Sequence, residues 1–517
     1  MQGRSEVQRQ LGDVEAWAGH LLPPGSVFSF LARHRRELFP DELFADLFRS
    51  ARGRPSVPAD VVATVIVLQS LHGLSDREAA EAVTFDLRWK AAAGLAVEAS
   101  SFHATTLTYW RRRLADSRRP NRILKVVRQV VAETGVLTGR TRRALDSTVL
   151  DDAVATQDTV TQLIAAIRRV RRDVPDAAPV VAEVCSAHDY DDPGKPAIAW
   201  DDEAARAALV DALVADAHRL LGGLPELERD PKQSEALALL ALIAGQDVEW
   251  IDGADTPEGG SWRIARRVAE DRVISVHDPD ARHAHKTVAR RQDGFKAHIA
   301  VEPETGLVTD CRLGKASGDG SGDAAVGIEL LATEQEPVEV LADSAYGTGA
   351  MLAELRDAEH IATIKPWPLR HPIPGGFTTS DFTVDEVART ITCPAGQTVT
   401  FTPVKRSAKF GRRCAGCPLR ERCTTSSAGR TVLLHQHDAL QRAHRMRFAD
   451  PAVLADYRQH RPMVERSIAW LTRGNRRLRY RGTVKNDAWL HHRTAALNLR
   501  RLLALGLNRT EGTWAIS

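Results

Sequence analysis

The sequence predicts an α/β fold built on a mixed sheet with flanking helices. Three observations support it: short apolar or alternating segments typical of strands, helical segments between the last of them, and long stretches with only helical periodicity elsewhere. Strands that alternate with helices imply a sheet covered on both faces. The expected strands are 142–150, 272–278, 295–303, 307–314, 337–347 and 361–367.

Length and composition indicate an ordinary soluble protein of two to four domains. The chain has 517 residues, of which 43% are hydrophobic and 26% are charged. It lacks the run of about twenty apolar residues that a membrane-spanning helix needs, and its first residues lack the apolar segment of a signal peptide. We therefore expect a cytoplasmic protein without a membrane partner.

The basic residues are concentrated in two regions, although the formal net charge is only +3. Between residues 111 and 143 the acids are Asp116 and Glu133 alone, and residues 457–509 contain thirteen Lys or Arg but two acids. Residues 173–260 lean acidic instead. This asymmetry indicates a polyanionic partner, most simply nucleic acid. Solvated faces in a protein from an Arg-rich proteome are the alternative.

The N-terminal region, residues 26–115, is expected to be helical. An apolar run ends at Gly73, and Ser75 and Glu78 have the spacing of a capping box for the next helix. Two helices joined by a short glycine-containing turn resemble a helix-turn-helix, although plain helical hairpins share this pattern. A third helix carries basic residues expected to contact DNA, Arg111, Arg112 and Arg113.

Two later segments stand apart from the sheet pattern. Residues 156–269 show helical periodicity and no strand-like segment. Residues 368–445 are rich in Pro, Gly, Thr and Ser, include short strand-like pieces, and contain four of the six cysteines. From Phe448 the pattern is helical nearly to the end. The sequence thus predicts a helical insert and a small β-rich insert.

In two strand-like segments an aspartate interrupts or ends the apolar run, although strands disfavour Asp. Asp146 interrupts the apolar segment 142–150, and Asp343 ends the apolar run that begins at Val338. A buried carboxylate is costly unless something compensates its charge. An acid that ends a strand before a glycine turn lies at the carboxyl edge of a sheet, where α/β sheets bind ligands. For either acid alone, helix capping is the simpler interpretation.

A third acid, Glu465, lies in the basic C-terminal helix, with Arg461 one turn before it and Tyr457 one turn earlier. A plain helical Arg–Glu pair is the alternative interpretation. Three carboxylates can hold two Mg²⁺ ions roughly 3.5–4 Å apart, which activate the attacking oxygen and stabilise the leaving oxygen in a phosphoryl transfer. Such a metal would compensate the charge of Asp146.

Four stretches resemble, in this order, bacterial insertion-sequence transposases of the DDE type: ALDSTVL, DPDARHAHKTVARRQDGFKAHIAVEPETGLVTDCRL, VEVLADSAYGTG and YRQHRPMVERSIAWL. The resemblance implies an RNase H-like catalytic core in which Asp146, Asp343 and Glu465 are the catalytic, metal-binding acids. Tyr457 and Arg461 match the Tyr-x₃-Arg-x₃-Glu helix of related elements. Many relatives carry Lys seven residues after the Glu, where this chain has Thr472 followed by Arg473.

The resemblance covers most of the chain and implies four parts. The N-terminal helices resemble the DNA-binding domain of the family, and the CPxG…CxxC…C insert is also shared. The implied parts are a helical DNA-binding domain, 1–140; an RNase H-like core, 141–155, 270–367 and 446–505; a mainly helical insert, 156–269; and a β-rich insert with four cysteines, 368–445.

The implied function is that of a transposase, with Mg²⁺ or Mn²⁺ as cofactor. It would bind the terminal inverted repeats of its element, cut double-stranded DNA at their ends and join the freed 3′-hydroxyl to target DNA, in association with the nucleoid. A homo-oligomer is expected, because two ends must be cut together. A nuclease without strand transfer and a catalytically silent DNA-binding protein are the alternatives. The expected DNA contacts are Tyr457, Arg461, Arg473, Lys296 and Arg111–Arg113.

The cysteines of the β-rich insert have a spacing typical of a metal site. Cys414 and Cys417 form a Cys-x₂-Cys knuckle, with Cys393 before it and Cys423 after it. We favour a structural Zn²⁺, with another metal, an iron–sulfur cluster or free thiols as alternatives. The stretch HDPDARHAHK also looks like a metal cluster, but its surroundings indicate a polar loop before a strand.

Overall fold

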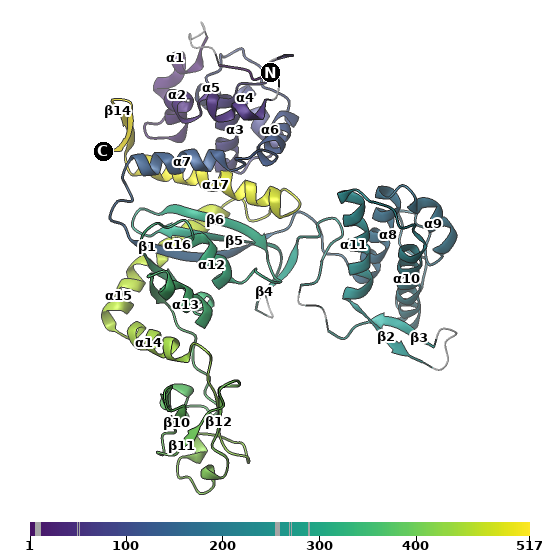
Figure 1. Ribbon diagram of the computed structural model, residues 1–517. Coiled ribbons are helices and arrows are strands. Elements are labelled where there is room, and N and C mark those ends of the chain that lie inside the picture. Colours follow the sequence, from purple (N-terminus) through teal and green to yellow (C-terminus); the bar gives the residue numbers. More distant parts are fainter. Residues whose placement is uncertain are drawn as a thin grey trace.

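The computed structural model describes residues 1–5, 12–48, 50, 52–253, 259–267, 269, 271–287 and 290–517. It has a mixed α/β architecture, as predicted, with a curled sheet at its centre and two inserts that project from it (Figure 1). Among the described residues, none of the helices combines the length and the apolar character that crossing a bilayer requires.

The central sheet contains strands that run in both directions. Its order is β4-β5-β1-β7-β8, and β6 pairs with β5. β5 is antiparallel to β1 and β6, whereas β7 is parallel to both β1 and β8. The strands are β1 Arg142–Asp151, β4 Arg282–Thr287, β5 Arg290–Glu302, β6 Leu307–Lys315, β7 Glu339–Ala342 and β8 Ile361–Ile364.

Successive side chains of β1 point to opposite faces of the sheet, and each face packs into a different hydrophobic core. Ala144 belongs to a large core shared with the C-terminal and N-terminal helices, whereas Leu145 belongs to a second core beneath α12 (Asp323–Leu331) and α13 (Gly349–Asp357). Figure 1 shows α12 and α13 below the sheet and α17 (Thr483–Ala504) above it. The expected helical cover on both faces is confirmed.

The N-terminal helices pack around α3 and rest on α17 (Figure 1). Every residue of α3 from Ala59 to Ser70 is buried, which makes it the central helix of this region. Gly73 ends α3 with a φ of 70°, and the capping box of Ser75 and Glu78 opens α4, as predicted. The helices are α1 Val14–Ala18, α2 Val27–Leu38, α3 Ala59–His72, α4 Asp76–Phe85, α5 Leu87–Ala93, α6 Thr105–Ala115 and α7 Arg122–Glu133.

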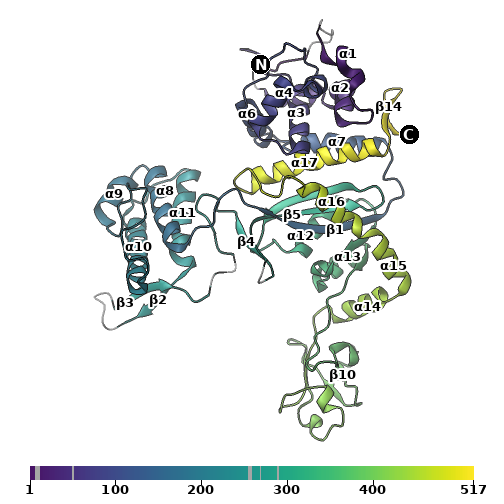
Figure 2. The ribbon, with the colours of Figure 1, turned by 180° about the vertical axis from the view of Figure 1, so that it is seen from behind.

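The helical insert extends to one side of the sheet and has its own apolar core (Figures 1 and 2). The expectation that residues 156–269 contain no strand is wrong, because the insert ends in a hairpin in which Trp250 faces Trp262 across the pair. Its elements are α8 Thr159–Asp173, α9 Ala177–Val184, α10 Glu203–Gly223, α11 Pro231–Gln246, β2 Val248–Asp252 and β3 Gly260–Ile264.

The segment 272–278, predicted to be a strand, forms none. Its backbone forms hydrogen bonds with side-chain amides of the helical insert, and not with a neighbouring strand. The amide groups of Gln162 and Gln246 donate to the Val273 carbonyl at 2.9 and 3.0 Å, and the Gln157 amide oxygen accepts the Val276 N–H at 2.8 Å. The apolar pattern predicted burial correctly, but tertiary hydrogen bonds satisfy the backbone.

The cysteine-containing insert projects from the opposite end of the sheet to the N-terminal helices and encloses a small core (Figure 1). The predicted strand-like pieces are short strands in two small sheets. The strands are β9 Thr383–Asp385, β10 Thr390–Thr392, β11 Thr398–Thr400, β12 Ser407–Lys409 and β13 Thr431–Leu433. The chain then returns through α14 (Asp438–Phe448), and after α17 it ends in a hairpin of β14 (Leu507–Thr510) and β15 (Thr513–Ile516).

Candidate active site

Asp146 and Asp343 are neighbours across two parallel strands. β1 and β7 pair with Ala144 opposite Leu341, so two further residues along each strand bring Asp146 beside Asp343. The Asp343 carboxylate accepts the Ala345 N–H at 2.9 Å and caps a short 3₁₀ helix, Ser344–Tyr346. Asp343 therefore caps a turn, as the simpler interpretation predicted, and it also lies beside a second acid.

Arg461 is the partner of Asp146. Its guanidinium lies 3.2 Å from the Asp146 carboxylate, and the two side chains are 6% and 17% exposed. Burial raises the pKa of Asp146, Arg461 opposes this effect, and the nearby Asp343 carboxylate raises the pKa further. The sequence interpretation assigned Arg461 to phosphates and the compensation of Asp146 to a metal, whereas here the compensating charge is Arg461.

Glu465 approaches from a helix that packs across β1 and β5. The predicted single C-terminal helix is two, α15 (Pro451–His460) and α16 (Pro462–Thr472), because Pro462 has no N–H to continue the hydrogen-bond ladder. Arg461 at the junction keeps helical dihedrals and lies 3.5 Å from the Glu465 carboxylate, whose side chain is 66% exposed.

The electrostatic surroundings of Tyr457 show that the acids gather on one side of the sheet. Burial raises the pKa of the Tyr457 phenol, Arg461 lowers it, and Asp343, Glu465 and Asp146 each raise it. All three predicted acids therefore lie near one hydroxyl, although Asp146 and Glu465 are separated by more than half of the chain. Within the described ranges, no three His, Cys, Asp or Glu side chains are close enough together to hold a metal ion.

Carboxylate oxygens suit a hard divalent cation, and the mutual effect of Asp146 and Asp343 is one that a cation would relieve. The chemistry of these two acids therefore suits a divalent metal. Glu465 would join them by a change of its exposed side chain, because α16 already lies over β1.

Some of the other residues predicted to contact DNA are exposed, and others form ion pairs within the fold. Lys296 lies 2.7 Å from Asp323 with its side chain 18% exposed, so its charge is neutralised within the fold. Arg111 pairs with Asp76 and stacks on Tyr480, so it also has an internal role. The exposed basic residues of the set are Arg112, Arg113 and Arg473.

The four cysteines of the β-rich insert line one small pocket between its sheets and its 3₁₀ turns. The pKa of the Cys423 thiol is raised by burial, lowered by Arg430, and raised again by the neighbouring Cys414, Cys393 and Cys417. In the described part of the chain the cysteines form no disulfide. The predicted set is thus brought together as a group of free thiols, without ligating geometry.

The loop that resembled a metal cluster caps a helix instead. Both oxygens of Asp278 accept the Gly482 N–H, at 3.1 and 3.0 Å, and Asp280 accepts the N–H and hydroxyl of Thr483 at 2.9 Å. These carboxylates lie at the N-terminus of α17, where anions are stabilised. The side chain of His285 lies outside the described residues.

The same loop creates a strained acid pair with Asp152. Burial, the charge of the adjacent Asp278 carboxylate and a hydrogen bond between the two carboxyl groups raise the pKa of Asp152 to about 6. Because the folded pKa lies above the ordinary value of 3.8, Asp152 contributes stability below about pH 4, and this contribution is lost as the pH rises through 6.

Replacement of this acid should therefore stabilise the protein near neutral pH. We expect Asp152→Asn to raise the free energy of unfolding at pH 7.5 by on the order of 1–3 kcal/mol, and to flatten the dependence of Tm on pH between about 4 and 6. Thermal melts over this range test it, with the exposed Asp201→Asn as control. A Tm at pH 7.5 equal to that of the control would show that Asp152 carries no such strain.

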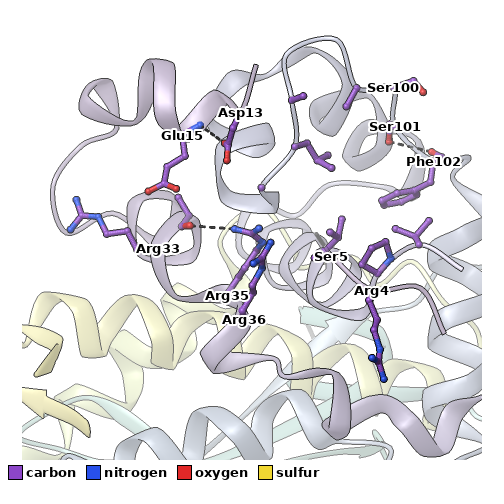
Figure 3. A pocket seen from close by; sticks show the side chains of 18 of the residues that line it. Arg4, Ser5, Asp13, Glu15, Arg33, Arg35, Arg36, Ser100, Ser101 and Phe102 are labelled. Carbon is purple, nitrogen blue, oxygen red and sulfur yellow. Dashed lines mark hydrogen bonds between the residues drawn. The ribbon is translucent and has the colours of Figure 1, made fainter. Parts of the chain in front are cut away.

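A separate cavity of about 600 Å³ lies in the N-terminal helical region. Figure 3 shows Arg4 and Ser5 on one side of it, Arg33, Arg35 and Arg36 on α2, and Asp13 and Glu15 opposite. Its lining mixes acids and bases, and Arg35 pairs with the buried Asp60 at 3.2 Å. The three acids described above do not line it.

Two parts of the chain, one toward each end, are similar to transposase family models. Residues 20–113 match the family model "Transposase domain (DUF772)", and residues 392–503 match the family model "Transposase DDE domain". The second match includes the cysteine group and the helices that carry Tyr457, Arg461 and Glu465. No curated protein and no solved structure was found to match the chain. The two family matches confirm the resemblance and are consistent with an insertion-sequence transposase of the DDE type. Of the four motifs, YRQHRPMVERSIAWL lies within a matched range, and the other three lie between the two matches.

Proposed function

We propose that the chain is the transposase of an insertion sequence, which binds terminal inverted repeats, cuts DNA at their ends and transfers the freed 3′-hydroxyl to target DNA. The observation that carries this proposal is the placement of Asp146 beside Asp343 in the sheet, with Glu465 on the helix above them. The strand order β6-β5-β1-β7-β8, antiparallel up to β1 and parallel after it, supports an RNase H-like core.

Asp146 and Asp343 would hold a divalent cation, Mg²⁺ or Mn²⁺, with Glu465 completing the ligand set. When bound, such a cation activates a water or hydroxyl and stabilises the leaving oxygen in phosphoryl transfer. Arg461 orients Asp146 and lowers the pKa of its carboxyl, which opposes the larger raising effect of burial. Tyr457 and Arg473 extend along the same helical pair, where they would position the phosphates next to the cut.

The N-terminal helices would supply recognition of the repeats. Arg112 and Arg113 are exposed on α6, and Arg113 also lies over the Phe48 ring, 5.0 Å from its centre, which fixes its direction. Double-stranded DNA is thus the proposed partner, and a homo-oligomer would bring two element ends together. Work on DNA within the cell implies a nucleoid-associated, cytoplasmic location.

The test is a cleavage assay with DNA that flanks the gene. The purified full chain, incubated with Mg²⁺ and a labelled duplex ending in the inverted repeats of that DNA, should cut at the repeat end and join the new 3′-end to a target plasmid. Cut ends without joined products would indicate a nuclease. Specific binding without cutting, in Mg²⁺ and in Mn²⁺, would indicate a silent DNA-binding protein.

We also propose a structural Zn²⁺ at the group formed by Cys393, Cys414, Cys417 and Cys423, whose shared pocket supports it. Purified protein should contain about one zinc per chain by elemental analysis, because four thiolates form a closed tetrahedral site. Replacing Cys414 by Ser should remove this zinc, whereas Cys185→Ser, in the helical insert, should leave it in place. Stoichiometric iron, or well-folded protein without metal, would contradict the zinc assignment.

A further inference from the structure

A basic groove lies where the ends of α3 and α16 meet α17. It has a volume of about 570 Å³ and is lined by Arg473, Arg493, Arg500 and Arg501, together with Trp470 and other neutral or imidazole side chains. Among the residues that the structure describes, no Asp or Glu lines the groove. Its size is that of a molecular ligand rather than of a single ion.

Backbone carbonyls and an aromatic ring, and no acid within the described part of the chain, hold the arginines of the groove in place. Arg493 is buried and donates to the carbonyls of Ser70, Leu71 and Trp470 at 2.6–2.7 Å. Arg500 and Arg501 both lie over the Trp470 ring, 5.9 Å from its centre. The fold therefore uses backbone carbonyls and an aromatic ring to position these cations, and leaves their charges uncompensated.

The cations act on one another, as their pKa values show. Burial and then the charge of Arg500 lower the pKa of Arg493 to about 10. Burial and the charge of Arg473 lower the pKa of Arg500. Arg493 and Arg500 also add to the lowering of the His72 pKa. An anion in the groove would relieve this repulsion.

An exposed ridge along α16 leads from Glu465 to the groove. Glu465, Ala469 and Arg473 are all exposed and follow one another at intervals of four residues, so they form a ridge on one side of the helix. Eight residues of helix span about 12 Å. A strand that passes Glu465 would thus reach Arg473 within about two nucleotides.

We infer that this groove binds the sugar–phosphate backbone of double-stranded DNA next to the site of cleavage, through Arg473 and Arg500. The inference rests on the proposed function, since it names the path of the DNA beyond the three acids. Backbone contacts of this kind carry no sequence information, so the groove should act on DNA of any sequence.

The experiment measures binding of the full-length protein to a labelled 20-base-pair duplex of random sequence over a range of salt concentrations. Each phosphate contact that is lost should reduce the slope of log K against log salt by about 0.9. We expect Arg473→Gln and Arg500→Gln each to weaken binding and to lower this slope by about that amount. The conservative Arg500→Lys should retain it, because the charge remains.

Arg206→Gln is the matched control, because Arg206 is an exposed arginine on α10 in the helical insert. It should leave the slope unchanged. Slopes for Arg473→Gln and Arg500→Gln equal to that of Arg206→Gln would overturn the inference. The arginine variants could change only how well inorganic phosphate competes with chloride for the groove, and not the binding of DNA. In that case the groove binds small anions, and the inference also fails.

The assay separates this inference from the proposed function. Asp146→Asn should keep the wild-type salt slope while it loses cleavage. If the protein cuts and joins DNA but the salt slope is the same in both arginine variants as in the wild type, the proposed function holds and the inference about the groove fails. A protein that never cuts, but whose slope falls in both arginine variants, would retain the groove as a DNA-binding surface.

Discussion

Replacing Asp146 or Asp343 by asparagine should reduce strand cleavage by about a thousandfold or more. Each carboxylate would contribute several kcal/mol of charge stabilisation around the cation, and each 1.36 kcal/mol is worth about a factor of ten in rate. Glu465→Gln should have an effect of the same order. Single-turnover cleavage of a repeat-end duplex in Mg²⁺ measures all three variants.

These variants should bind the repeat-end duplex as the wild-type protein does, because the exposed basic residues of α6 and α16 are unchanged. Asp357→Asn, an exposed acid at the end of α13, is the control and should cleave normally. Near wild-type cleavage by any one of the three variants would remove that residue from the proposed trio.

Removing the guanidinium of Arg461 should destabilise the protein by about 3 kcal/mol, because a buried pair that loses one member leaves an uncompensated charge. Arg461→Met keeps much of the side-chain volume, so packing changes little. The loss should appear as a lower midpoint in urea unfolding. The effect should be largest above the pKa of Asp146, where its carboxylate is ionised.

The double variant Arg461→Met with Asp146→Asn should recover a large part of this stability, because the remaining group is then neutral. Millimolar Mg²⁺ should also stabilise Arg461→Met more than it stabilises the wild type, since a cation beside Asp146 and Asp343 would replace the missing charge. An unchanged unfolding midpoint for Arg461→Met would show that the pair with Asp146 contributes little.

Much of the sheet could be predicted from the sequence. Five of the expected strands are present, and the acids occur where the apolar pattern is interrupted or ends, at Asp146 and Asp343. Capping of α4 by Ser75 and Glu78 was also predictable. Each of these features depends on residues within a few positions of one another, so a local pattern contains the information.

The partners of the charged residues could not be predicted in this way. Arg461 reaches Asp146 from more than 300 positions along the chain, and Lys296 is neutralised by Asp323 on a helix that crosses its strand. The composition shows that basic residues are numerous, but it does not show which of them form ion pairs with acids. Only the tertiary structure distinguishes the cations that are paired with acids from those that line the groove, such as Arg473 and Arg500.

The sequence by itself determined five strands of the sheet and the helical and cysteine-containing character of the two inserts, and its motifs indicate the three acids of the proposed site. The tertiary structure decided which hydrogen-bond partners the backbone of these segments has and which ion pairs their charged side chains form. Segment 272–278 is buried without a strand partner because side-chain amides of the helical insert satisfy it, and Asp278 caps α17 because that helix begins beside its loop. Apolar periodicity reports burial along a segment, whereas hydrogen bonds and ion pairs depend on where distant segments come together.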